Sequence, residues 1–120
     1  MPKVMLVDDS KFMRMLLRNI INSIEDFEIV SECDDGSKAL EEYSKSKPDI
    51  VLMDLVMQTS GIDATRELKN YDPKVSIVCC TAMGGEEALM KDAIDAGAEK
   101  RYITKPFKKE EVEDALKSVM

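Results

Sequence analysis

Five polar residues close or directly follow apolar stretches of this sequence and could together form a reactive site: Asp8, Asp9, Asp54, Thr81 and Lys105. Two like charges about 4 Å apart repel by roughly 4 kcal/mol at an effective dielectric constant near 20. The three carboxylates, if clustered, must therefore take up protons or bind positive charge. Lys105 offers one positive charge, and a divalent cation would bring the formal sum to zero. A site with few carboxylates and much water suits Mg2+, although this argument leaves Ca2+ and Mn2+ open.

The elements that must position these residues follow from the pattern of apolar side chains. Short apolar runs rich in β-branched residues predict strands at 3–7, 28–33, 49–53, 75–80 and 101–104. Their nearly continuous hydrophobicity is typical of a parallel sheet covered on both faces. Helical spacing predicts helices at 10–24, 37–47, 62–70, 86–96 and from 109 onwards. This alternation indicates one α/β domain over residues 1–120.

In a parallel sheet the carboxyl ends of the strands meet at one edge, where ligand sites gather. We therefore expect the five polar residues to lie together at that edge. We also expect Ser10 to cap the first helix. The apolar face of that helix, including Phe12 and Met15, is expected to be core.

Composition excludes several function classes. The chain has 120 residues, a net charge of −7 and no histidine, so histidine-based nucleophile systems and histidine-ligated zinc are excluded within it. An acidic domain repels a phosphate backbone, and we expect no nucleic-acid partner. No apolar run is long enough to cross a membrane, so we expect a cytoplasmic protein. Cys33, Cys79 and Cys80 lack metal-ligand spacing and are expected to be buried, reduced thiols.

Four segments, LVDDSKFMR, PDIVLMD, CTAM and ITKPF, resemble in order and spacing the motifs of the response-regulator receiver domain. Within that family, DDSKFMRMLL and TAMGG make the chain most similar to stand-alone chemotaxis regulators of the CheY type. The resemblance covers essentially the whole chain. It implies a flavodoxin-like, doubly wound fold, with five helices around a five-stranded parallel sheet of order 2-1-3-4-5.

The same resemblance implies roles for the acidic residues. Asp54 would accept a phosphoryl group from a phosphohistidine of a sensor histidine kinase. Asp9, Asp54 and the backbone carbonyl of Val56 would bind Mg2+ directly, and Asp8 would act mainly through a metal-bound water. The cation would neutralise charge on the transferring phosphoryl group, which is most of the catalysis that such a transfer needs.

The resemblance also implies a conformational switch. Lys105 and the Thr81 hydroxyl would each contact a phosphoryl oxygen, and the bond between Lys105 and Pro106 would be cis. Thr81 would move toward the phosphoryl group, and Tyr102 would then pass from a solvent-facing to a buried rotamer. The surface formed by the fourth helix, the fifth strand and the fifth helix would change its affinity for partners.

The function implied is a phosphorylation-activated signalling switch of chemotaxis or motility. The expected partners are a histidine kinase, a downstream motor-switch or adaptor protein and, as a further candidate, a phosphatase. We expect a monomer that is no enzyme beyond its own phosphorylation and dephosphorylation. A phosphorelay intermediate and a degenerate dimerisation module are alternatives. A metal-dependent phosphohydrolase would need an acid two residues after the nucleophile, where Val56 stands.

The sequence departs from the family pattern after Asp54. The family shows a proline where Gln58 stands and a glycine eight residues after the aspartate, whereas Gly61 comes after seven. We expect this short loop, without its stiffening proline, to tune partner recognition or the placement of the next helix. Val56 and Met83 are apolar at the positions that border the attacking water, which predicts slow loss of the phosphoryl group. Residues 83–85 are expected to form a flexible loop.

Overall fold

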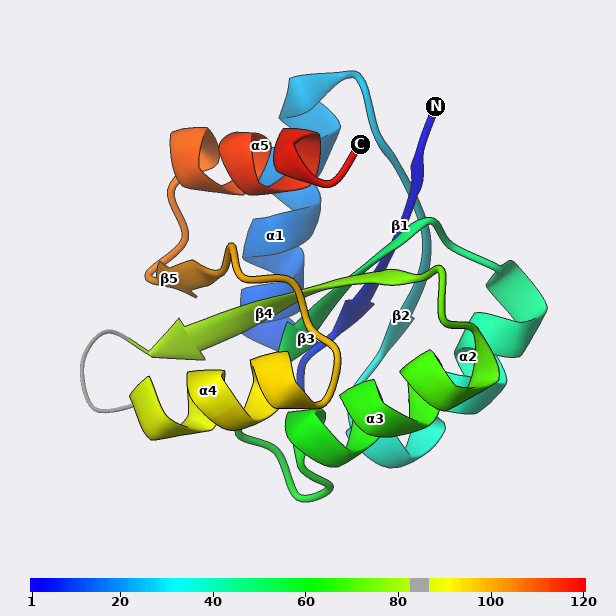
Figure 1. Ribbon diagram of the computed structural model, residues 1–120. Helices are drawn as coiled ribbons and strands as arrows, with labels where there is room; N and C mark the ends of the chain where they lie inside the picture. Colours follow the sequence, from blue (N-terminus) through cyan, green and yellow to red (C-terminus); the bar gives the residue numbers. More distant parts are fainter. Residues whose placement is uncertain (83–86) are drawn as a thin grey trace.

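The computed structural model describes residues 1–82 and 87–120 and contains one parallel sheet (Figure 1). The strands lie in the order β2-β1-β3-β4-β5, which confirms the predicted order. Their bounds are β1 (Lys3–Val7), β2 (Glu28–Cys33), β3 (Ile50–Asp54), β4 (Ser76–Ala82) and β5 (Ile103–Lys105). The predicted strands are therefore all present, but β4 extends through Thr81, and β5 begins after Tyr102.

Helices cover both faces of the sheet. They are α1 (Lys11–Ile24), α2 (Ala39–Ser46), α3 (Gly61–Tyr71), α4 (Glu87–Asp95) and α5 (Lys109–Ser118), and a 3-10 turn, Gly36–Lys38, precedes α2. Figure 1 shows α1 and α5 on one side and α2, α3 and α4 on the other. Each side has its own apolar core, which explains why β1 from Val4 onward and all of β3 are buried. The five predicted helices are confirmed.

The prediction that Phe12 and Met15 belong to the core is wrong. Phe12 is 59% exposed and Met15 is 41% exposed. The buried face of α1 is formed by Leu17, Ile21 and Ile24, spaced four and three residues apart. Phe12 lies five residues before Leu17, and Met15 lies two residues before it. At 100° per residue, both positions point well away from the buried face. The apolar residues at the start of α1 therefore do not lie on its buried face.

Two further predictions on local structure are confirmed. Ser10 caps α1, because its side chain accepts a hydrogen bond from the Met13 N–H at 3.2 Å. All three cysteines are free and buried. Among the described residues, no helix is long and apolar enough to cross a membrane.

Candidate functional site

The carboxyl edge of the sheet brings three acids together. β1 and β3 are neighbours with Val7 opposite Met53, so Asp8 and Asp54 leave adjacent strands side by side. Oxygen atoms of Asp8, Asp9 and Asp54 lie within 4.8 Å of one another. The side chains of Asp8 and Asp54 are buried, whereas Asp9 is exposed. The cluster predicted from strand ends is therefore present, with one acid open to solvent.

Lys105, the last residue of β5, points into this cluster. Its Nζ lies 3.2 Å from Oδ2 of Asp8 and 3.4 Å from Oδ1 of Asp54. Burial lowers the pKa of Lys105, but the charges of Asp54 and Asp8 outweigh it and raise the pKa overall. The lysine therefore remains charged. One ammonium among three carboxylates leaves two negative charges in a largely buried place.

Two observations show that a divalent cation fits this place. Oδ2 of the buried Asp8 accepts no hydrogen bond of acceptable geometry from the described residues, and only the ion pair with Lys105 reaches it. The pKa of Asp54 is raised to about 6, first by burial and then by the charge of Asp8, while Lys105 opposes the rise. The donors are carboxylate oxygens, which hard cations such as Mg2+ prefer. Asp8, Asp9 and Asp54 could hold such an ion, and the excess charge favours it.

Asp8 is fixed from three directions. Its Oδ1 accepts a hydrogen bond from the Ser10 N–H at 2.9 Å, and its own N–H donates to the Cys33 carbonyl at 3.1 Å. The Arg14 guanidinium donates to the Asp8 carbonyl and lies 3.4 Å from Glu32. Sequence reasoning did not single out Arg14. The position of Arg14, one turn into α1 and six residues after Asp8, could have indicated that its side chain reaches back to Asp8.

The other predicted residues occupy three distinct places. Thr81 is 3% exposed in β4 and pairs with Thr104 of β5. Tyr102 is 44% exposed and lies just before β5. Val56 is exposed, and its N–H donates to Oδ1 of Asp54 at 3.3 Å. The bond between Lys105 and Pro106 is cis. Residues 83–85, with the predictions made for them, lie outside the described residues.

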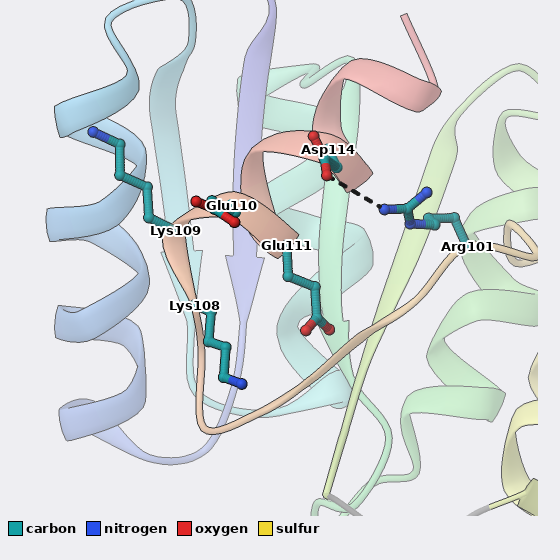
Figure 2. A pocket seen from close by; sticks show the side chains of 6 residues that line it. All are labelled: Arg101, Lys108, Lys109, Glu110, Glu111 and Asp114. Carbon is teal, nitrogen blue, oxygen red and sulfur yellow. Dashed lines mark ion pairs between the residues drawn. The ribbon is translucent and has the colours of Figure 1, made fainter.

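A shallow cavity of about 550 Å³ lies beside α5 (Figure 2). Its lining mixes three basic and three acidic residues: Arg101, Lys108, Lys109, Glu110, Glu111 and Asp114. Arg101 and Asp114 lie 3.8 Å apart. Glu111 extends toward β5, where its carboxylate accepts hydrogen bonds from the N–H and the hydroxyl of Thr104. This carboxylate ties α5 to the strand that carries Lys105, a contact that sequence reasoning missed.

A family comparison explains this combination of fold and site. The model of the response regulator receiver domain matches residues 4–117, so the chain belongs to the response regulator receiver domain family. This is the receiver domain of two-component systems, in which phosphorylation and Mg2+ are general features.

Two relatives place the chain further within that family. It is 50% identical to the chemotaxis protein CheY of Halobacterium salinarum and 44% identical to that of Thermotoga maritima, each over 98% of this chain and 96% of the relative. The solved CheX-CheY-BeF3-Mg2+ complex from Borrelia burgdorferi matches with a TM-score of 0.87 at 31% identity, covering 98% of this chain and 87% of that one. The chain is therefore a receiver domain similar to CheY-type chemotaxis regulators, and its family implies phosphorylation-dependent signalling.

Proposed function

We propose that this chain is a phosphorylation-activated chemotaxis switch that accepts a phosphoryl group on Asp54. The observation that carries the proposal is the convergence of Asp8, Asp9, Asp54 and Lys105 at one sheet edge. Asp54, the proposed nucleophile, is the last residue of the fully buried strand β3, which limits the motion of its side chain. Such positioning supplies much of the catalysis of phosphoryl transfer.

In the proposed reaction, an Asp54 carboxylate oxygen attacks the phosphorus of a phosphohistidine on a kinase. A phosphorus–oxygen bond forms, the phosphorus–nitrogen bond breaks, and the released imidazole takes a proton from solvent. Mg2+, held by Asp9, Asp54 and the Val56 carbonyl with Asp8 through water, would neutralise charge on the phosphoryl oxygens. Lys105 would contact one of these oxygens, and the Thr81 hydroxyl would donate to another.

The proposed output follows from the same residues. Phosphorylation adds negative charge and acceptor oxygens beside Lys105 and Thr81. Thr81 pairs with Thr104, which Glu111 ties to α5, so a movement at Thr81 has a short path to the surface of β5 and α5. The exposed Tyr102 would turn inward, and the face of α4, β5 and α5 would change its affinity for a motor or adaptor protein. The partners would be a histidine kinase and, by analogy with the complex of CheX and CheY from Borrelia burgdorferi, a further protein that binds the receiver domain.

The proposal predicts a metal-dependent adduct on one residue. The protein is incubated with a small phosphodonor and Mg2+, and its intact mass is measured beside Asp54→Asn and an EDTA control. We expect one phosphoryl adduct on the wild type and none in either control, because the reaction needs both the carboxylate and the cation. An adduct of equal yield on Asp54→Asn would refute the assignment of the nucleophile.

A second prediction concerns how fast the acyl phosphate is lost. The side chains of Val56 and Met83 offer no polar group that could orient an attacking water. We expect Val56→Asn with Met83→Glu to accelerate loss of the phosphoryl group by about a hundredfold, the lower end of the range for a positioned polar group. The measurement is the decay of the adduct after the phosphodonor is removed, with Val56→Leu as an apolar control. An unchanged decay rate would contradict the explanation.

A further inference from the structure

The loop that follows the phosphoacceptor has an anchor outside the predicted site. Residues 55–60 join β3 to α3 without a proline. The Gly61 N–H donates to the Leu55 carbonyl at 3.2 Å, which closes the loop on itself. The Thr59 N–H donates to Oδ1 of Asp35 at 2.9 Å, across 24 positions of sequence. This second bond ties the loop to the connection between β2 and α2.

Asp35 is itself held firmly. Its Oδ2 accepts from the Ser37 N–H at 3.0 Å, and its carbonyl accepts from the Lys38 N–H at 3.1 Å. The Thr59 N–H first, and then the Ser37 N–H, keep the pKa of this carboxyl well below its usual value. The carboxylate is therefore charged, and its bond to Thr59 is of the stronger, charge-assisted kind.

The two connections also pack tightly. Gly36 is buried, and a Cβ at that position would lie 2.9 Å from the Thr59 carbonyl oxygen and 3.1 Å from Cβ of Ala64. A cavity of about 390 Å³ beside this contact has Asp9, Asp35 and Thr59 in its lining. The anchor therefore lies next to the exposed acid of the candidate cation site.

The anchored loop carries groups of that site. Val56 lies three residues before Thr59, and its N–H already orients Oδ1 of Asp54. A shift of Thr59 would move Val56, and with it both its carbonyl and the Asp54 carboxylate. Sub-ångström placement matters for metal ligands, and residues that hold ligands in place change metal affinity by about ten- to a hundredfold.

We propose that Asp35 is a positioning residue for the cation site: by holding the Thr59 N–H, it fixes the loop that places Val56 and Asp54. This inference rests on the proposed function, because it assumes that Mg2+ binds at Asp9 and Asp54. In this chain the Asp35–Thr59 bond and the contact at Gly36 supply the restraint that a proline in the loop would otherwise give. Asp35 touches neither the cation nor the phosphoryl group in this role.

The test compares Mg2+ dissociation constants by calorimetry for the wild type, Asp35→Ala, Asp35→Asn and Asp34→Ala. Asp34 is the matched control, because it lines the same cavity, carries the same charge and pairs with Lys38 at 2.7 Å instead of binding the loop. Asp35→Asn removes the charge but keeps an oxygen that can accept from Thr59. Urea unfolding without Mg2+ shows that each variant is folded.

We expect Asp35→Ala to weaken Mg2+ binding by about tenfold, the lower end of the range for residues that hold ligands. Asp34→Ala should weaken Mg2+ binding by less than about twofold, because the charge of Asp34 is exposed and screened by salt. Asp35→Asn should retain most of the Mg2+ affinity that Asp35→Ala loses. Equal losses in Asp35→Ala and Asp34→Ala, or in Asp35→Ala and Asp35→Asn, would show a charge effect alone and overturn the inference. If the wild type bound no Mg2+, the proposed function would fail with it. If the wild type binds Mg2+ and forms the adduct while Asp35→Ala behaves as Asp34→Ala, only this inference fails.

Discussion

Gly61→Ala is expected to lower the free energy of unfolding by at least about 3 kcal/mol, the upper part of the range for overpacking. A Cβ at Gly61 would lie 2.0 Å from the Asp54 carbonyl oxygen and 2.9 Å from the Asp54 carbonyl carbon and the Leu55 Cα. These are backbone atoms at the end of a buried strand, so they cannot turn aside as a side chain would. The gain of about 1 kcal/mol from replacing glycine by alanine in a helix is too small to compensate.

The measurement is urea unfolding of Gly61→Ala beside Gly36→Ala and the wild type. Gly36 is the graded control, because its Cβ would approach the nearest backbone atom to 2.9 Å and not to 2.0 Å. We expect Gly36→Ala to cost clearly less than Gly61→Ala. Where Gly61→Ala still folds, displacement of Asp54 should also weaken Mg2+ binding. A Gly61→Ala protein as stable as the wild type would show that α3 does not press on β3 in solution.

The short loop shows what sequence reasoning could and could not supply. Counting residues from Asp54 to Gly61 revealed that the connection is one residue shorter than the family pattern. Counting could not reveal that α3 then begins directly against the Asp54 carbonyl, because that contact depends on where the helix packs. Asp35 was missed for a related reason: its partner, Thr59, is 24 positions away, and no local pattern links them.

The strands and the acidic cluster were predictable for a physical reason. A parallel sheet requires apolar runs covered on both faces, and it carries all its strand ends to one edge. These two rules bring Asp8, Asp54 and Lys105 together before any contact is known. Helix faces were less predictable, because Phe12 and Met15 are apolar without sharing the buried stripe of α1. The roles of Thr81, Tyr102 and Val56 remain predictions that phosphorylation experiments can test.

The second large effect is expected from Asp54→Asn in the absence of metal: a gain of about 1 to 3 kcal/mol in the free energy of unfolding at pH 7. The pKa of Asp54 is about 6 in the folded protein, against an ordinary value of 3.8, and each pKa unit corresponds to about 1.4 kcal/mol. Between these two values the folded protein retains a proton that the unfolded chain has released. The stability of the wild type therefore falls as the pH rises from about 4 to 6, and the loss persists above 6.

Asparagine has no charge at any of these pH values, so the variant should not show this loss. Its advantage should be largest at pH 7 and should shrink toward zero near pH 4, as measured by urea unfolding in EDTA across this range. Asp63→Asn is the matched control, because Asp63 is exposed on α3 and pairs only weakly with Arg66 at 3.2 Å. If Asp54→Asn raised the free energy of unfolding equally at pH 4 and pH 7, the charge of Asp54 would not be the cause of the gain. Under the proposed function, saturating Mg2+ should then narrow or reverse the difference in stability at pH 7, because the cation would bind the Asp54 carboxylate and stabilise only the protein that has it. The burial of Asp54 and the charge of Asp8, which lower the stability of the metal-free protein, would thus favour the binding of a cation at this place.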